Sequence, residues 1–140
     1  MKLSIYTNIP TPNQLDFFKA LADNFFDLQV IYYAYREPNR YWKLHPKVVG
    51  YKVVVVKDSI LVKPILKKYI SFHFSWSIFR IAWNDESPII IVGGAYNTPN
   101  TIIAAIIGKI RRKKVAFFGE RLYDTKNIFH YFLKKLHCCQ

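Results

Sequence analysis

A carboxylate beside a glycine, Glu120, is the residue whose type and position most directly suggest chemistry. It follows a short apolar run that predicts a buried strand, and it stands between Gly119 and Arg121. A carboxylate at the end of a strand can project from the sheet edge and act as a general base toward a substrate hydroxyl. The alternative from the residues alone is a structural carboxylate that pairs with Arg121 or caps the next turn.

A glycine pair, Gly93 and Gly94, ends another predicted buried strand earlier in the chain. Glycine lets the backbone turn sharply and lets a ligand approach the peptide N–H groups of the following helix. The pair lacks the G-x-G-x-x-G fingerprint and the Walker lysine, so it predicts neither NAD nor ATP binding. It is equally compatible with a simple tight turn between strand and helix.

Both sites belong to a predicted strand, helix and strand within residues 89–121, which indicates a parallel unit. Ligands of open parallel sheets bind beyond the carboxyl ends of the strands, so both glycine-containing ends should face one crevice. The start of the chain shows the same order, with a strand at residues 2–8, a helix at about residues 14–23 behind an Asn13 cap, and a parallel strand at residues 28–34.

The rest of the chain continues this alternation. The further predicted elements are an outer strand at residues 51–56, a helix at 75–83, a helix from about Asn100 to Arg112 capped by Thr98 or Asn100, a strand at 115–118 and a helix at 127–136. Residues 35–48 are polar, aromatic and interrupted by prolines, which predicts an irregular loop, whereas residues 59–69 predict no clear element. We therefore expect an α/β, Rossmann-like three-layer domain with a mainly parallel sheet, formed as a single domain by residues 1–140.

Composition supports one ordinary globular core. The 140 residues are 51% hydrophobic and 17% aromatic, and no apolar run reaches the ~18 residues that a membrane span needs. We expect a cytoplasmic protein. Cys138 and Cys139 are adjacent, which predicts free thiols, and the four histidines have no metal-ligand spacing. We expect neither a metal nor a cofactor.

The net charge of +12 indicates an anionic partner: nucleic acid, anionic lipid headgroups or a phosphorylated substrate. The basic cluster at residues 109–114 is best interpreted as a solvated helix end, with contact to a membrane surface as the alternative. Nucleic acid is disfavoured because most aromatic residues have the spacing of a core. Tyr41 and Trp42 lie in a basic loop and could either stack on a sugar or base, or anchor that loop.

The chain resembles the N-terminal half of a family 4 type glycosyltransferase with the GT-B fold. The resemblance rests on the opening IYTNIPTPNQLDFFKAL, on the block IIIVGGAYNTPNTIIAAIIGKIRRKKVAFFGER, and on the aromatic loop at Arg40-Tyr41-Trp42. The block is similar to the glycine pair, helix, basic turn, strand and glutamate of bacterial hexosyltransferases that build surface polysaccharides. These three segments are spread over most of the chain, from Ile5 to Arg121.

The resemblance implies that this domain holds the acceptor, a glycan or a lipid-linked sugar, in surface polysaccharide synthesis. It assigns a catalytic role to Glu120 and acceptor binding to Pro12, Asn13, Tyr41, Trp42, Gly93, Gly94, Tyr96, Gly119 and Arg121. A nucleotide-sugar donor would be bound by a second domain with an E-x7-E pair, which has no counterpart in these residues. The expected protein is therefore one half of a GT-B fold, inactive alone, at the inner face of the membrane.

Two other interpretations stay open. One is a basic α/β module that binds nucleic acid or phosphorylated ligands without chemistry. The other is an inactive remnant with an exposed apolar interface.

Overall fold

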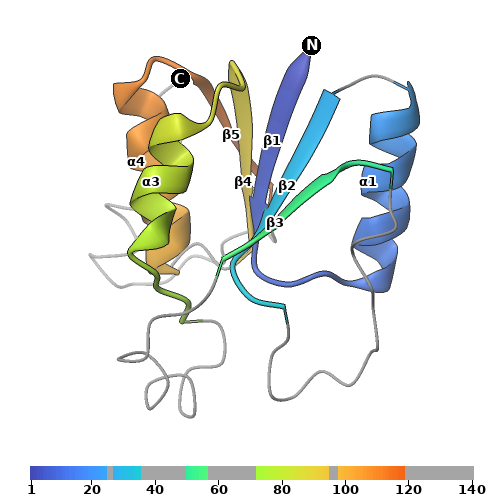
Figure 1. The fold of residues 1–140 in the computed structure, drawn as a ribbon, viewed down its shortest axis with the longest axis horizontal. Coiled ribbons are helices and arrows are strands. Elements are labelled where there is room, and N and C mark those ends of the chain that lie inside the picture. Colours follow the sequence, from blue (N-terminus) through green and yellow to red (C-terminus); the bar gives the residue numbers. More distant parts are fainter. Residues whose placement is uncertain (25–26, 36–49, 57–71, 95–97, 119–140) are drawn as a thin grey trace, which may run out of the picture.

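Strands and helices alternate along the part of the chain that the computed structural model describes, which is residues 1–24, 27–35, 50–56, 72–94 and 98–118. The strands are β1 (Lys2–Thr7), β2 (Asp27–Tyr32), β3 (Lys52–Val55), β4 (Ile89–Gly93) and β5 (Lys114–Phe118). The helices are α1 (Pro12–Asn24), α3 (Ser77–Asn84) and α4 (Pro99–Ile110) (Figure 1).

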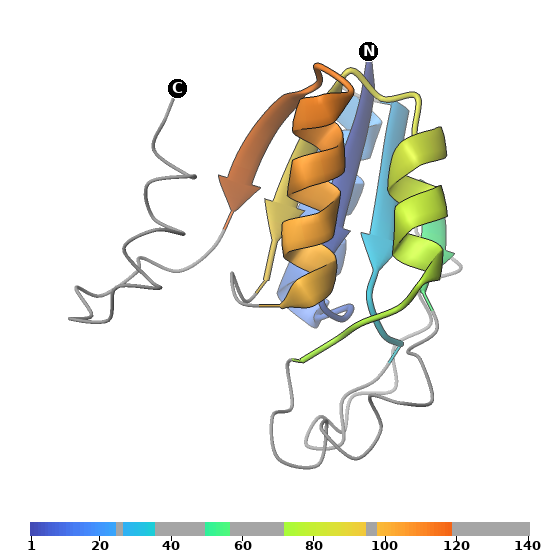
Figure 2. The ribbon, with the colours of Figure 1, turned by 90° about the vertical axis from the view of Figure 1, so that its left-hand side faces the viewer.

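The strands form one sheet in the order β3-β2-β1-β4-β5, and every neighbouring pair is parallel. Helix α1 covers one face of the sheet, and helices α3 and α4 cover the other (Figures 1 and 2). These three layers confirm the predicted α/β, Rossmann-like domain with a parallel sheet. The prediction that the domain is half of a GT-B fold stays a prediction.

Alternation along β1 separates the two cores, because successive side chains of a strand point to opposite faces. Leu3 and Ile5 pack with Phe18 of α1 in one apolar cluster. Tyr6 belongs to the other cluster, on the side of α3 and α4. Since both faces of β1 are buried, its register against β2 and β4 is strongly specified.

The starts of the helices correct one prediction and refine another. Helix α1 begins at Pro12, and the carbonyl of Thr11 accepts the first helical hydrogen bond, from the N–H of Leu15 at 3.0 Å. The predicted Asn13 cap is therefore wrong: proline suits the first helical position because no N–H is needed there. Thr98 does hold the N-cap position of α4, but its side chain makes no capping hydrogen bond.

Helix α4 ends in a Schellman turn whose left-handed residue is an arginine. The N–H of Lys113 donates to the carbonyl of Gly108, and the N–H of Arg112 donates to that of Lys109. Arg112 has φ 55°, a conformation in which glycine is usually found. Gly108 allows α4 to approach the sheet, since a Cβ there would lie 2.3 Å from Cδ1 of Ile90.

Strand β3 lies at one edge of the sheet, as the prediction of an outer strand required. The predictions for the loop beyond Tyr35, for residues 59–69, for the helix at 127–136 and for Cys138 and Cys139 fall outside the described residues. Among the helices that are described, none combines the length and the apolar character needed to cross a membrane.

Candidate functional site

The direction of chain progression reverses between the central strands β1 and β4. From β1 the chain builds outward to β2 and β3 on one side, and from β4 it builds outward to β5 on the other. The carboxyl ends of β1 and β4 therefore lie side by side while their following segments diverge. In open parallel sheets this switch point is where ligands bind.

The residues after these two strands pack closely. Gly94 has φ +88°, and a Cβ on it would lie 2.4 Å from Oδ1 of Asn8, which follows β1. Gly93 is tightly placed as well, because a Cβ there would lie 3.2 Å from the carbonyl oxygen of Phe118. The positive φ of Gly94 favours glycine, and the Phe118 carbonyl leaves little room for a side chain at Gly93. The absence of a side chain at Gly94 also leaves space for the Asn8 amide.

Two helices begin at this same edge. Helix α1 follows β1, and helix α4 follows β4, so the positive ends of both helix dipoles flank the switch point (Figure 1). The first turn of α4 is fixed by Asn100: its Oδ1 accepts the N–H of Ser75 at 3.0 Å, and its N–H donates to the carbonyl of His73. Oriented N–H groups at helix starts favour an anionic or hydroxyl-bearing ligand.

The carboxyl edge also gathers buried polar atoms that lack hydrogen-bond partners. Among the described residues, all such side-chain atoms lie in the segments after β1 and β2 or in the first turns of α1 and α4. They are Oδ1 of Asn8, Oε1 of Gln14, the hydroxyl of Tyr33, Nδ2 of Asn100 and Oγ1 of Thr101. Buried polar groups in native proteins are nearly always paired, so five unpaired ones at a single edge require an explanation.

Tyr33 shows the electrostatic character of this edge. Its side chain is completely buried, and burial raises the pKa of its hydroxyl, while the adjacent Thr101 hydroxyl, whose contact with it falls short of hydrogen-bond geometry, opposes that rise. The phenol therefore stays neutral and keeps a proton that it can donate. Together the set offers amide and hydroxyl groups of both senses, donors and acceptors, which suits a ligand rich in hydroxyls.

The structure brings together four of the predicted site residues at this edge. Pro12 and Asn13 are exposed in the first turn of α1, Gly93 ends β4, and Gly94 follows it. The other predicted site residues lie outside the described residues: the catalytic candidate Glu120, and Tyr41, Trp42, Tyr96, Gly119 and Arg121. The unpaired polar atoms were missed, because only the folded chain shows which side chains lack partners.

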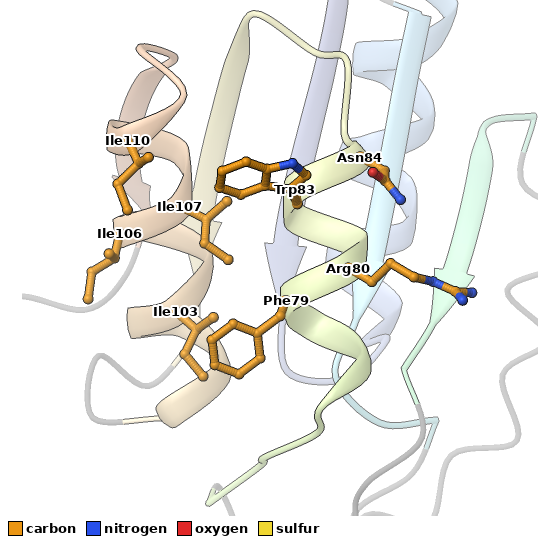
Figure 3. A pocket seen from close by; sticks show the side chains of 8 residues that line it. All are labelled: Phe79, Arg80, Trp83, Asn84, Ile103, Ile106, Ile107 and Ile110. Atoms are coloured by element: carbon orange, nitrogen blue, oxygen red, sulfur yellow. The ribbon is translucent and has the colours of Figure 1, made fainter.

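A second feature, on the outer side of α3 and α4, corrects the interpretation that the aromatic residues belong to the core. Ile78 and Ala82 of α3 are buried, but Trp76, Phe79 and Trp83 are exposed by 68%, 42% and 53%. The last two extend toward the isoleucines of α4 and line an open groove of about 530 Å³ (Figure 3).

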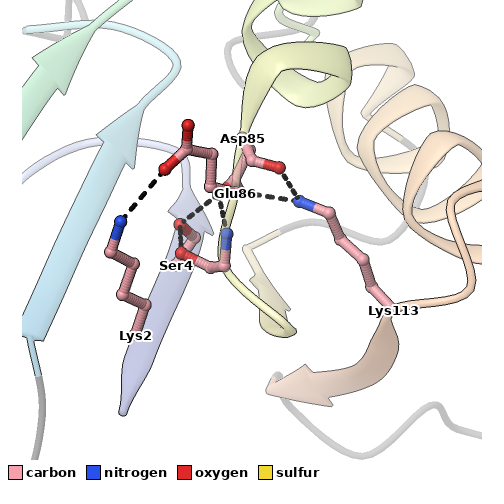
Figure 4. Close-up of polar contacts among 6 residues, drawn as sticks. Lys2, Ser4, Asp85, Glu86 and Lys113 are labelled. Atoms are coloured by element: carbon pink, nitrogen blue, oxygen red, sulfur yellow. Dashed lines mark hydrogen bonds and ion pairs between the residues drawn. The ribbon is translucent and has the colours of Figure 1, made fainter.

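A third feature is a buried polar network at the opposite, amino edge of the sheet, around Asp85. One carboxylate oxygen accepts the hydroxyl of Ser4 at 3.0 Å and the N–H of Ser87 at 2.8 Å, and the other accepts the hydroxyl of Tyr6 at 2.8 Å. The ammonium of Lys113 donates to the carbonyl of Asp85 and lies 3.5 Å from its carboxylate (Figure 4). The carboxylate is fully surrounded by partners, which indicates a structural role.

Lys113 also corrects the interpretation of the basic cluster as a solvated helix end. Its side chain is only 6% exposed, and burial lowers the pKa of its ammonium while Asp85 opposes that change. The neighbouring Arg111, Arg112 and Lys114 are exposed, so that interpretation holds for them. Asp85 likewise raises the pKa of Tyr6, in addition to the larger effect of burial.

No group of three or more histidine, cysteine, aspartate or glutamate side chains could hold a metal ion within the described ranges.

Comparison with known proteins yields no relative. No protein-family model, no curated protein and no solved structure matches the chain. The function is therefore argued from the geometry of the chain itself.

Proposed function

We propose that the carboxyl edge of the sheet binds a sugar-bearing acceptor, and that this domain is the acceptor side of a hexosyltransferase. The observation that carries the proposal is the set of unpaired buried polar atoms at the carboxyl edge of the sheet. Leaving a buried donor or acceptor unpaired costs about 1–3 kcal/mol, so a ligand that pairs these atoms recovers free energy that the free protein lacks.

A sugar fits this edge better than an apolar ligand does. Each sugar hydroxyl both donates and accepts, so it can pair with an acceptor such as Oδ1 of Asn8, with a donor such as Nδ2 of Asn100, or with the two-way hydroxyl of Thr101. The helix starts of α1 and α4 would stabilise a phosphate on the same ligand. A sugar joined to a phosphate is therefore the chemical class that we propose.

The remaining parts of the proposal follow from the resemblance to glycosyltransferases. Glu120 would serve as a general base, and a nucleotide-sugar donor would be bound by a second Rossmann-like domain that is not part of these residues. The acceptor would be a glycan or a lipid-linked sugar of surface polysaccharide synthesis, met at the cytoplasmic face of a membrane. The positive net charge supports an anionic acceptor or surface.

Isothermal calorimetry with the 140-residue chain tests the proposal. The probes are glucose, galactose and N-acetylglucosamine, each also as its 1-phosphate. We expect saturable binding of at least one probe, and roughly three- to tenfold weaker binding by Asn8→Ala and by Thr101→Val, because each removes one hydrogen bond to the ligand.

The matched control is Asn24→Ala, since Asn24 is exposed at the far end of α1 and its amide donates to the carbonyl of Ala20. Its affinity should equal that of the unmodified chain. Equal affinity of all three variants, or no binding of any probe, would contradict the proposal. Tight binding to arbitrary DNA with a steep salt dependence would instead favour the basic nucleic-acid module.

A further inference from the structure

The outer side of helices α3 and α4 presents large apolar side chains to the exterior. We define the α3–α4 face as Trp76, Phe79, Trp83, Ile106 and Ile110, which are exposed by 68%, 42%, 53%, 52% and 61%. Other exposed large apolar side chains of the described chain, such as Phe17 on α1, lie elsewhere. Contiguous apolar surface of this kind marks an interaction site.

The face is also hollowed. Phe79 and Trp83 reach from α3 toward α4, and between the helices lies the groove of about 530 Å³, lined by Ile103 and by the buried Ile107 among others (Figure 3). A groove that runs between two helices with aromatic walls can take up acyl or other apolar chains.

Cations border the apolar residues. Arg80 lines the groove and extends from α3 on the side away from α4 (Figure 3), and the guanidinium of Arg111 lies 5.8 Å from the ring centre of Trp83. The described carboxylates nearby already have cationic partners. Asp85 is buried in its network with Lys113, and the exposed Glu86 is joined to Lys2 at 3.0 Å and also interacts electrostatically with Arg111.

Arg112 adds an argument from the backbone. It is exposed and has φ 55°, where glycine would relieve strain. A cation at a position that favours glycine is consistent with a use for its charge. It follows Arg111, the C-cap residue of α4, and is two residues beyond Ile110 of the face.

We propose that the α3–α4 face docks on the surface of an anionic lipid bilayer. Tryptophan and phenylalanine beside arginine are the residues that anchor proteins in the headgroup region, where one side is apolar and the other is charged. A second copy of this chain is the poorer occupant, because a twofold contact through this face would bring the arginines of both copies together. The anionic surface supplies the charge that the face lacks.

The inference deepens the proposed function, which places the acceptor at a membrane, by naming the surface that faces the lipid. Helix α4 starts at the carboxyl edge of the sheet, so a bilayer against α3 and α4 would adjoin the candidate acceptor site (Figure 2). A sugar carried on a lipid phosphate would then reach that site without leaving the membrane surface.

Cosedimentation with vesicles tests the docking surface. We expect the chain to bind vesicles of phosphatidylcholine with phosphatidylglycerol, and to bind pure phosphatidylcholine far less. Trp83→Ala should weaken binding roughly tenfold through lost apolar contact, and Arg112→Ala roughly fivefold through lost charge. The matched control is Phe17→Ala, because Phe17 is 53% exposed, like Trp83, but lies on α1 across the sheet. Its binding should be unchanged.

Fluorescence adds a readout that does not require the separation of bound from free protein. In a Trp42→Phe background, the emission of Trp76 and Trp83 should shift to the blue on vesicle binding and be quenched by brominated lipid. No quenching, or equal loss of binding by Phe17→Ala and Trp83→Ala, overturns the docking surface. So does a dimer in light scattering that Trp83→Ala dissociates, or binding to arbitrary DNA that displaces the vesicles.

The two proposals fail separately. Trp83→Ala should keep the affinity for soluble sugars, and Thr101→Val should keep vesicle binding. If the unmodified chain binds sugars but not vesicles, only the docking surface is refuted. If it binds vesicles but not sugars, only the acceptor site is refuted.

Discussion

Two buried tyrosines, Tyr6 and Tyr33, occupy comparable surroundings but have different partners. Both are at most 1% exposed and belong to the same apolar cluster. The hydroxyl of Tyr6 donates to the Asp85 carboxylate at 2.8 Å, whereas that of Tyr33 makes no hydrogen bond of good geometry and has only the Thr101 hydroxyl beside it. The Tyr6 hydroxyl therefore contributes to stability, whereas burial of the Tyr33 hydroxyl lowers it.

We expect Tyr6→Phe and Tyr33→Phe to change the free energy of unfolding by amounts that differ in sign or size. Tyr6→Phe removes a hydrogen bond to a charged group and should lower the free energy of unfolding by about 1.5–3 kcal/mol. Tyr33→Phe removes an unpaired group and should leave that free energy unchanged or raise it by up to about 1 kcal/mol. Urea unfolding measures both. Destabilisation of Tyr33→Phe as large as that of Tyr6→Phe would show that the Tyr33 hydroxyl is already paired.

The glycine that follows β4, Gly94, yields a second contrast. Gly94→Ala adds a Cβ at 2.4 Å from Oδ1 of Asn8 and at φ +88°, so it suffers both strain and a clash. Gly50→Ala suffers only the strain of φ +74°, because the nearest atom to its Cβ would be 3.9 Å away. We expect a loss of about 1 kcal/mol for Gly50→Ala and a larger loss, of about 1–3 kcal/mol, for Gly94→Ala, whose Cβ must also displace the end of the Asn8 side chain.

Because Gly94→Ala would displace the Asn8 amide, it should also weaken sugar binding, which Gly50→Ala should leave intact. Calorimetry on both variants checks this. Equal stability and equal affinity of the two variants would contradict the placement of Asn8.

At the scale of elements, the Asp85 network ties β1, the segment before β4 and the turn from α4 to β5 together at the amino edge (Figure 4). Its charges are nearly removed from water, since the side chains of Lys113 and Asp85 are 6% and 2% exposed. Removing one member of such a pair leaves the other charge uncompensated.

Lys113→Ala should accordingly destabilise the fold by about 3 kcal/mol. Its sequence neighbour Lys114 is exposed, so Lys114→Ala should change the free energy of unfolding by less than about 0.5 kcal/mol. Chemical denaturation at neutral pH compares them. Similar small effects for both would mean that the Lys113 ammonium is solvated and that the network does not need it.

The buried tyrosines of β1 and β2 make the sheet sensitive to alkali. Burial is the main cause that raises the pKa of Tyr6, Tyr32 and Tyr33 above the ordinary value of 10.0. Above that pH the tyrosines of the unfolded chain lose protons that the folded chain keeps. The contribution of the three buried tyrosines to the free energy of unfolding is therefore complete below pH 10 and is lost as the pH rises. Each contributes a slope of about −1.4 kcal/mol per pH unit once the unfolded tyrosine is ionised.

Lys113 changes stability with pH in the opposite direction, because its lowered pKa makes the folded chain lose this proton at a lower pH than the unfolded chain does. It is, however, one group against three tyrosines. We therefore expect the urea midpoint to fall steeply above about pH 10, together with a cooperative rise of tyrosinate absorbance. A midpoint that stays constant or rises over this range would contradict the burial of these hydroxyls.

At the scale of the whole molecule, the sequence was sufficient to predict the layered parallel fold. The β-branched runs in Val53-Val54-Val55 and Ile89-Ile90-Ile91 can only be satisfied in buried or paired strands, and the helical spacing of Leu15, Phe18 and Leu21 requires a helix between the first strands. Such patterns are local. The prediction places the start of α1 two residues late, behind an Asn13 cap, although proline is favoured at the first helical position and α1 begins at Pro12.

The candidate site was predictable only in part. The glycine pair at the end of β4 is visible in the sequence, but the packing of Gly94 against Asn8 joins residues far apart in the chain. The Asp85 network has the same character, since Ser4 and Lys113 come from opposite ends of the described chain. The exposure of Trp83 could not be inferred either, because the same helical spacing fits a core face and a docking face.

The central claim, that the carboxyl edge binds a sugar through unpaired polar groups, is tested most directly by the side-chain amides of asparagine. An NMR titration of the ¹⁵N-labelled chain with glucose 1-phosphate and the other sugar probes follows each amide separately. We predict saturable shifts for Asn8 and Asn100, with Asn24 and the exposed Asn84 unchanged. Saturation that moves Asn84 but leaves Asn8 and Asn100 in place, or no shift with any probe, would contradict the account.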